Sequence, residues 1–259
     1  MLSLNEIILK SIAKLIQSSS KDKKLEKIYK AHQAKLHFIP IQYRVFGGVL
    51  QSMNIQFGNF IEELMSELVR QSGYEILALS GTKNKKFQIS SQADSLIDQY
   101  ITKAQSSIDF ELEKEFAKLK SSILADTSKS DLSVKHDIDL LFKDEQDQIY
   151  YVEIKYNDDH DTGKFIDINR KFLKSYVYLV REFSRDITPI LFYFNNKKLK
   201  GNIYLPEQEC IYRGERFFSK FLKFDYKNLQ ELLINFAQNA QNIAQFNELY
   251  TLIMKKYNV

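Results

Sequence analysis

Residues 149–156, IYYVEIKY, and residues 137–142, DIDLLF, decide the fold class of this chain. Both stretches are rich in β-branched, aromatic and aliphatic residues, which favour strands. The polar segment between them, KDEQDQ, favours a turn, so we expect an antiparallel hairpin. Because side chains alternate between the two faces of a strand, Glu153 and Lys155 are expected on the same face.

The segments on either side of the hairpin complete an α/β pattern. Residues 166–184 predict a helix, and the apolar residues 187–194 predict a strand after it. The further elements expected are a helix at 57–70 that Gly73 ends, paired strands at 74–79 and 87–90 around a turn at 81–85, helices at 92–105 and 109–124, and mostly helical ends at 1–35 and 216–257. The predicted fold is therefore α/β, a mixed central sheet flanked by helices, with additional N- and C-terminal helices.

Composition indicates one globular domain over residues 1–259. The chain is 44% hydrophobic and has only 8 Gly and 3 Pro, which is typical of a folded protein rather than a disordered one. We expect a catalytic core at about 57–195 and a helical C-terminal part at about 216–257. The net charge of +4 permits nucleic-acid binding without demanding it.

The sequence also indicates a cellular compartment. A single cysteine, Cys210, excludes a disulfide framework and a thiolate metal cluster, which fits a reducing cytoplasm. The N-terminal residues 1–24 have the pattern of an amphipathic helix, without the cleavage site of a signal peptide. No run reaches the roughly 18 apolar residues of a membrane span. We therefore expect a cytoplasmic protein that does not enter the membrane.

Three charged residues on these apolar strands indicate chemistry. Asp139 lies on the strand before Glu153 and Lys155, and charged groups on such strands are costly unless they pair or bind a cation. Two carboxylates directed at one point form a hard oxygen site that suits Mg²⁺. A lysine beside them can orient a water molecule or stabilise negative charge on a phosphate.

This pattern resembles the PD-(D/E)xK nuclease superfamily, whose core has Asp on one strand and Glu-x-Lys on the next. The matching segments are Asp139 in KHDIDLLF and Glu153-Ile154-Lys155 in YYVEIKY, although no proline precedes the aspartate. Asp137 shares a strand face with Asp139 and remains the alternative, but an apolar run directly follows Asp139, as the superfamily pattern has it. Nucleases of this superfamily often add a glutamate from an N-terminal helix. Glu62 borders the apolar arc of helix 57–70 and is our candidate for that metal-binding or water-positioning role.

The surrounding sequence is similar to type II restriction endonucleases that cut interrupted palindromes such as GGNCC or GANTC. The similar segments run from LHFIPIQYRVFGGVLQSM at 36–53, through KYNDDHDTGKFIDINRKFLKSYVYL at 155–179, to IYRGERFFSKFL at 211–222. The resemblance implies a restriction-endonuclease-like fold, Mg²⁺ dependence, double-stranded DNA as substrate and products with 5′-phosphates. Cutting both strands of a palindrome most simply needs two active sites, so we expect a homodimer on DNA. A cognate DNA methyltransferase is the expected genetic partner.

Two groups of residues are candidates for contacting DNA. The loop after the Glu-x-Lys strand offers Asn157, Asp158, Asp159 and His160, whose polar groups can read base edges; Asp161 or Thr162 is expected to cap the next helix. That helix has an apolar side with Ile168, Phe172, Tyr176, Leu179 and Phe183, and a basic side. The basic candidates for phosphate contact are Lys164, Arg170, Lys171, Lys174 and, near the end of the core, Arg213. The alternatives are a solvated basic helix face and, at Arg213, a simple turn.

We weigh three functions for this chain. The first is a type II restriction endonuclease. The second is a structure-specific repair or recombination nuclease with the same catalytic trio and no sequence requirement. The third is a non-catalytic DNA-binding protein that retains the hairpin as a scaffold; the intact trio of charged residues argues against this last one.

Overall fold

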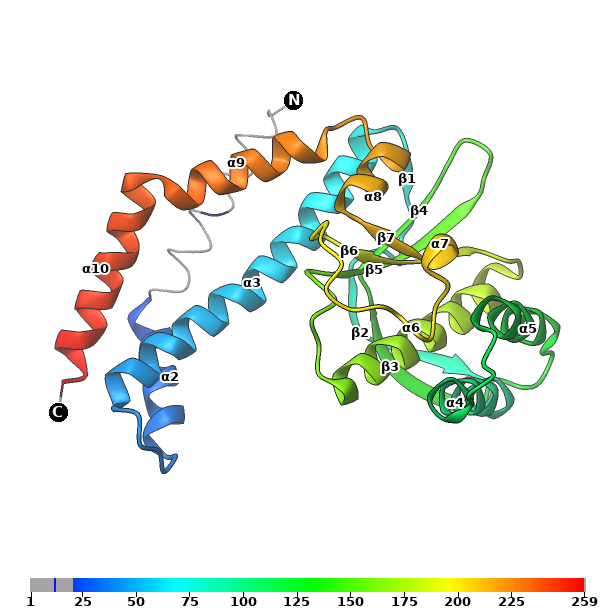
Figure 1. The fold of residues 1–259 in the computed structure, drawn as a ribbon, viewed down its shortest axis with the longest axis horizontal. Coiled ribbons are helices and arrows are strands. Elements are labelled where there is room, and N and C mark those ends of the chain that lie inside the picture. Colours follow the sequence, from blue (N-terminus) through cyan, green and yellow to red (C-terminus); the bar gives the residue numbers. More distant parts are fainter. Residues whose placement is uncertain (1–11, 13–20, 259) are drawn as a thin grey trace. The chain divides into compact units, whose positions relative to one another are not determined.

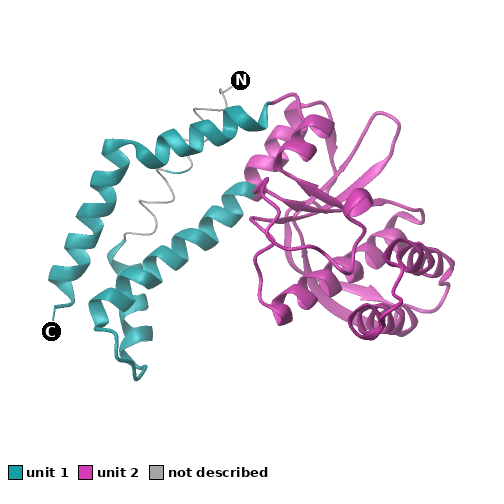
Figure 2. Ribbon diagram, viewed as in Figure 1, with its two compact units in different colours: residues 1–61, 225–259 teal, residues 62–224 magenta. Residues whose placement is uncertain are grey.

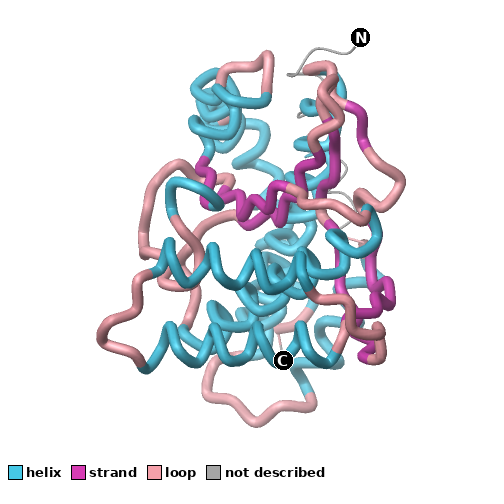
Figure 3. The backbone as a smooth tube through the Cα atoms, turned by 90° about the vertical axis from the view of Figure 1, so that its right-hand side faces the viewer, coloured by secondary structure: helices cyan, strands magenta, loops and turns pink. Residues whose placement is uncertain are grey.

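The computed structural model describes Ile12 and residues 21–258 as a mixed α/β fold in which helices account for more of the chain than strands (Figures 1 and 3). The helices are α2 (Asp22–Gln33), α3 (Ile41–Gln71), α4 (Ser91–Ser106), α5 (Leu112–Ala125), α6 (Thr162–Phe183), α7 (Glu207–Cys210), α8 (Gly214–Phe221), α9 (Tyr226–Gln238) and α10 (Ala240–Lys256). The strands are β1 (Glu75–Ile76), β2 (Thr82–Ile89), β3 (Leu132–Ile138), β4 (Leu140–Lys143), β5 (Ile149–Lys155), β6 (Thr188–Tyr193) and β7 (Ile211–Arg213). The expected fold class and the additional helices near both ends are confirmed, whereas most of the predicted helix before Ser20 lies outside the described residues.

The chain divides into two compact units, residues 1–61 with 225–259 and residues 62–224 (Figure 2). In the first unit, α2, α9, α10 and the first part of α3 are helical, and Val45, Val49 and Ile253 are fully buried in its apolar core. The second unit holds both sheets and every candidate site residue. That the chain acts as a single domain stays a prediction. None of the described helices combines the length and the apolar character that crossing a membrane requires.

The five-stranded sheet has the order β1-β4-β5-β6-β7. Strands β4 and β5 pair antiparallel, with Leu140 opposite Val152, which confirms the predicted hairpin. Strands β5, β6 and β7 run parallel, and α6 connects β5 to β6, as the strand–helix–strand pattern predicted. In this register Lys155, Tyr193 and Arg213 are neighbours at the ends of three adjacent strands.

The predicted pairing of residues 74–79 with 87–90 is wrong. Glu75 and Ile76 form β1, which pairs with β4 in the large sheet, whereas β2 pairs with β3 in a separate two-stranded sheet. Long-range packing decides this difference, because β2 directs Phe87 onto α6, where its ring stacks on Tyr178 with 4.1 Å between centroids. Gly73, with a φ of 105°, follows the end of α3 as predicted.

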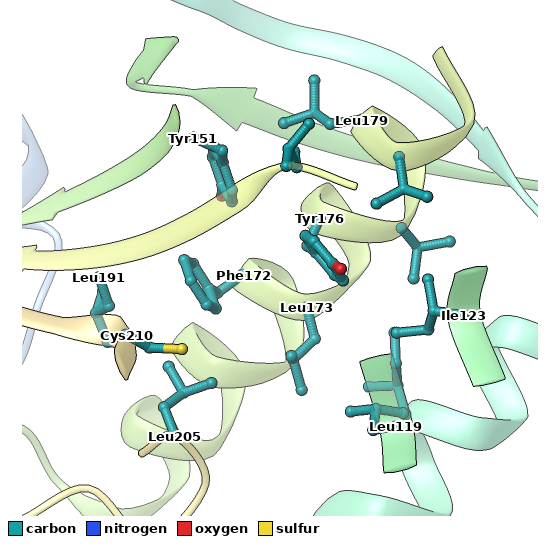
Figure 4. Close-up of a cluster of buried hydrophobic side chains, with 14 of the residues drawn as sticks. Leu119, Ile123, Tyr151, Phe172, Leu173, Tyr176, Leu179, Leu191, Leu205 and Cys210 are labelled. Atoms are coloured by element: carbon teal, nitrogen blue, oxygen red, sulfur yellow. The ribbon is translucent and has the colours of Figure 1, made fainter. Parts of the chain in front are cut away.

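The main hydrophobic core lies between the large sheet and α6 (Figure 4). Phe172 and Tyr176 on the apolar side of α6 are fully buried, and the ring of Phe172 stacks on that of Tyr151 from β5. Each fully buried side chain of this kind contributes about 1.5–3 kcal/mol to folding. Cys210 is buried in the same cluster. This packing fixes β5 and the charged residues that it carries.

Candidate active site

Asp139 lies at a break between two strands. Strand β3 ends at Ile138 and β4 begins at Leu140, so the stretch predicted as one strand is shared between the two sheets. The Asp139 side chain is buried, and its Oδ2 accepts the backbone N–H of Ile154 at 2.8 Å. The pairing of β4 with β5 ends at Leu140 and Val152. Ile154 lies beyond this last pair, and its N–H donates to the Asp139 carboxylate instead of to a backbone carbonyl of β4. The break thereby fixes Asp139 beside Glu153 and Lys155.

The ammonium of Lys155 is surrounded by three oxygen atoms. Its Nζ lies 2.6 Å from Oε1 of Glu153, 2.9 Å from the carbonyl oxygen of Ile154 and 3.5 Å from Oδ2 of Asp139. Burial acts to lower the pKa of Lys155, but the charges of Glu153 and Asp139 outweigh it and hold that pKa above its usual range. The lysine is therefore a charged donor held beside two carboxylates, one of which, Glu153, lies on the same strand face as strand alternation predicted.

Tyr151 belongs to the same face of β5 and was missed in the sequence. Its hydroxyl donates to Oε2 of Glu153 at 3.1 Å, and burial raises the pKa of this phenol well above its usual value. The other oxygen of Glu153 accepts from Lys155, so both carboxylate oxygens have donors. The i, i+2, i+4 spacing of Tyr151, Glu153 and Lys155 is the signal in the sequence that could have identified this tyrosine.

Glu62, near the end of α3, contacts the same cluster through Lys83 on β2. The Glu62 carboxylate pairs with Lys83, whose Nζ also lies 3.9 Å from Oδ1 of Asp139. Burial and then the charge of Asp139 raise the pKa of Glu62, against the opposing effects of Lys83 and Lys155. The structure thus brings the expected helix glutamate near Asp139. Lys83 was missed because only the long-range pairing of β2 with β3 brings it here.

Asp137, the alternative aspartate, has different surroundings. It is exposed on β3, and its Oδ1 accepts the backbone N–H of Asn84, which has a left-handed φ of 55°. This contact closes an irregularity in the β2–β3 pairing between Thr82 and Lys85. The structure therefore brings Asp139 rather than Asp137 into contact with Lys155.

The oxygen atoms of this cluster have the chemistry of a divalent-cation site. Burial, and then the charge of Glu153, raise the pKa of Asp139 to about 6 despite the nearby lysines, and a bound cation would favour its charged form. Carboxylate and carbonyl oxygens are the donors that Mg²⁺ and Ca²⁺ prefer. Among Ile12 and residues 21–258, no three His, Cys, Asp or Glu side chains are already arranged to hold a metal. The carboxylate oxygens of this cluster are therefore suitable ligands for a divalent cation, but in this structure they are contacted by Lys83 and Lys155.

Asp158, in the loop after β5, has protein partners in this structure, and its predicted role as a DNA contact stays a prediction. This residue, expected to contact bases, is only 1% exposed, and its oxygens accept the backbone N–H groups of Leu199 and Lys200 at 3.0 and 3.1 Å. It also forms an ion pair of 3.0 Å with Arg213, which was expected to contact DNA. Arg213 additionally reaches Glu207 at 3.2 Å. Two predicted DNA contacts therefore bind each other, because the fold joins strand ends that are distant in sequence.

The other residues of this loop lie nearer the surface. Asp159 is exposed and pairs with Lys200 at 3.6 Å, and the same lysine donates to the carbonyl oxygen of His160 at 2.6 Å. Asn157 accepts the backbone N–H of Asp159 at 3.3 Å. Asp161 caps α6 by accepting the backbone N–H of Lys164 at 2.9 Å, as expected, and Lys164 itself is exposed.

The basic residues of α6 are partly engaged in ion pairs with α4. Arg170 contacts Asp98 at 2.8 Å, and Lys174 pairs with Asp94. Lys171 is exposed. These ion pairs hold two helices together, so the basic side is not simply a solvated face. Phosphate contact by these three residues stays a prediction.

Arg213→Ala is expected to lower the free energy of unfolding by about 3 kcal/mol, because it leaves the buried carboxylate of Asp158 without its counter-ion. Arg185→Ala is the matched control: Arg185 pairs with Asp147 at the surface, where an ion pair contributes less than about 1 kcal/mol. Chemical denaturation of both variants measures the difference. If Arg213→Ala is as stable as the control but loses DNA affinity, Arg213 is a DNA contact after all.

Comparisons with known proteins give this geometry a context. The family model described as "Type II restriction endonuclease, HinfI" matches residues 2–237 of the chain. The chain is also 50% identical over 255 residues, 97% of each protein, to a protein of Haemophilus influenzae named type II restriction enzyme HinfI. Both matches include the hairpin, its catalytic candidates and the loop that follows β5.

Proposed function

Because the chain belongs to the HinfI family of type II restriction endonucleases, it is a site-specific deoxyribonuclease with DNA as its partner, and we propose that it makes Mg²⁺-dependent double-strand cuts at a short interrupted palindrome of the GANTC or GGNCC kind. Its fold is of the restriction-endonuclease type. Family membership favours this function over a structure-specific repair nuclease and over a non-catalytic DNA-binding protein. Type II restriction enzymes generally need a divalent metal ion.

The observation that carries the proposed site is the set of contacts around Lys155. Asp139 and Glu153 would hold Mg²⁺, with Glu62 as a further carboxylate beside Asp139. When bound, the ion supplies positive charge against the scissile phosphate. Hard oxygen donors, among them the buried carboxylate of Asp139, support this choice of metal.

Lys155 is the residue that we assign to the attacking water. Its charged ammonium would donate to the water oxygen or to the phosphate, and Glu153, fixed by Tyr151, would hold the lysine in position. The water oxygen attacks phosphorus in line with the bond to the 3′ oxygen and gives up a proton to the solvent, that bond breaks, and the 3′ oxygen takes up a proton, so one water molecule is consumed. The products are a 3′-hydroxyl and a 5′-phosphate.

A homodimer on DNA belongs to the same proposal, since a two-fold axis relates the two strands of a palindrome. Leu36 and Phe38, between α2 and α3, expose 105% and 92% of their reference surfaces, and exposed apolar side chains of this kind favour protein contact.

A cognate methyltransferase that protects host DNA is the proposed genetic partner. The single cysteine supports the cytoplasm as the proposed location.

Digestion of a plasmid with Mg²⁺ tests the proposed reaction. The expected result is a set of discrete fragments whose sequenced ends all map to one interrupted palindrome and ligate without prior phosphorylation, because they carry 5′-phosphates. The control is the same reaction with the metal chelated, which should leave the plasmid intact. Random fragments, or nicks confined to branched DNA, would contradict site-specific restriction.

A further inference from the structure

Lys83 is a second lysine on the carboxylate cluster, and the proposed mechanism gives it no role. It pairs with Glu62, and its Nζ lies 3.9 Å from Oδ1 of Asp139. Lys155 approaches the other oxygen of Asp139, Oδ2, at 3.5 Å. The two oxygens of this buried carboxylate are therefore approached by different lysines.

The direction of Lys83 is specified by the backbone around it. The next residue, Asn84, has a left-handed φ of 55°, and its N–H donates to the carboxylate of Asp137. On the other side, the hydroxyl of Thr82 donates to the carbonyl oxygen of Leu79 at 2.9 Å. These contacts fix both ends of the irregularity in β2, so they hold Lys83 toward Glu62.

Lys83 is charged in this position and yet accessible to solvent. Burial acts to lower its pKa, but its hydrogen bond to Glu62 and the charges of Glu62, Asp139 and Asp137 raise that pKa above the usual value. The side chain remains 42% exposed, whereas those of Lys155 and Asp139 are 25% and 5% exposed. Partly exposed ion pairs are weak, so this ammonium can leave the carboxylates more easily than Lys155 can.

A divalent cation at this cluster would need the oxygens that Lys83 contacts. Glu62 and Asp139 are candidate ligands of that cation, and its charge would repel the Lys83 ammonium, which reaches the same carboxylates and lacks the further contacts with Glu153 and the Ile154 carbonyl oxygen that hold Lys155. Lys83 stands on a strand beside the cluster, so an ammonium released from it would remain close to the proposed metal site, against which the scissile phosphate would lie. Backbone phosphates are the groups that such a lysine binds.

We propose that Lys83 is an exchangeable counter-ion, which occupies the Glu62 and Asp139 carboxylates in the metal-free protein, leaves them when the divalent cation binds, and then contacts a backbone phosphate of the DNA. This inference rests on the metal site of the proposed function. According to this proposal, Lys83 contacts the phosphate only after the divalent cation has bound.

Metal binding without DNA tests the exchange. Mn²⁺ prefers the same oxygen donors, and the electron paramagnetic resonance signal of the free ion measures its binding. Lys83→Met is expected to bind Mn²⁺ about three- to fivefold more tightly than the parent, because the competing ammonium is gone. Lys83→Arg and the exposed control Lys86→Met are expected to bind it as the parent does. Equal or weaker binding by Lys83→Met would overturn the exchange.

DNA binding with Ca²⁺ in place of Mg²⁺ tests the phosphate contact, since Ca²⁺ takes oxygen ligands. With Ca²⁺, Lys83→Met should bind cognate DNA more weakly, and its slope of log affinity against log salt concentration should be smaller by about one. Without metal, parent and variant should bind alike, because Lys83 is then held by Glu62. The same loss with and without Ca²⁺ would show a contact that does not depend on the metal, and would overturn the coupling.

Asp139→Asn separates this inference from the metal site on which it rests. If Asp139→Asn loses Mn²⁺ binding while Lys83→Met binds as the parent does, the exchange is wrong and the metal site stands. If Asp139→Asn binds Mn²⁺ as tightly as the parent, the proposed metal site itself is wrong.

Discussion

Lys155→Ala is expected to slow DNA cleavage by about a thousandfold while specific DNA binding remains largely intact. The ammonium contacts Glu153, Asp139 and the carbonyl oxygen of Ile154, and it is the donor that we assign to the attacking water or the phosphate. Its removal takes away stabilisation that is needed in the transition state rather than contacts that read the sequence. Single-turnover cleavage with Mg²⁺ and gel-shift binding with Ca²⁺ measure the two effects separately.

Lys118→Ala is the control for the loss of a lysine. Lys118 is an exposed residue of α5 that pairs with Glu115 at the surface, and its removal should change neither rate nor affinity. Cleavage by Lys155→Ala at the parental rate would show that the site is assigned wrongly. A variant that loses binding and cleavage together would instead place Lys155 among the DNA contacts.

Asp139→Asn is expected to slow cleavage by a similar factor, about a thousandfold. The neutral amide oxygen is a weaker ligand for a divalent cation than the charged carboxylate. The amide oxygen can still accept the N–H of Ile154, so the strand break between β3 and β4 should keep its conformation. The rate is measured with Mg²⁺ raised well above the parental requirement, so that weak metal binding and loss of catalysis are distinguished.

The same variant is expected to stabilise the metal-free protein at neutral pH. The pKa of Asp139 is raised from its usual value to about 6, so the folded state disfavours the charged carboxylate. A carboxyl group with a raised pKa favours folding below about pH 4, and that contribution is lost as the pH rises to about 6. The neutral amide removes this penalty above pH 6. Thermal unfolding at pH 5 and pH 8 without metal should therefore show the larger gain at pH 8.

Asp137→Asn is the matched control for Asp139→Asn. Asp137 is exposed and accepts the N–H of Asn84, so its substitution should reduce cleavage by no more than about tenfold. The variant that loses more of its cleavage rate identifies which of the two aspartates binds the metal. A larger loss for Asp137→Asn than for Asp139→Asn would mean that the wrong residue has been assigned to the metal.

The parts of the site that the sequence predicted depend on local geometry. Strand alternation predicts Glu153 and Lys155 on one face whatever surrounds them, and the helical wheel of α3 selected Glu62. The polar residues between β4 and β5 predicted their hairpin, and the apolar side of α6 predicted the helix that covers it. These features need only the spacing of residues that are near one another in the chain.

The remaining parts depend on contacts between distant segments. Nothing local divides the stretch 137–142 between two sheets, yet that break separates Asp137 from Asp139. The ion pair of Asp158 with Arg213 joins the loop after β5 to the end of β7, and the contact of Lys83 with Glu62 joins β2 to α3. The erroneous pairing of residues 74–79 with 87–90 has the same cause, because β1 and β2 each pair with a strand far along the chain.

The burial of Cys210 has a practical consequence for spectroscopy. It is the only cysteine of the chain, it is fully buried, and burial raises the pKa of its thiol, so little reactive thiolate is available to a labelling reagent. A cysteine introduced at an exposed position, such as that of Lys86 on β2, would therefore take a maleimide dye or a spin label selectively in the otherwise natural chain. Fluorescence and spin-label distance measurements thus need no cysteine-free background.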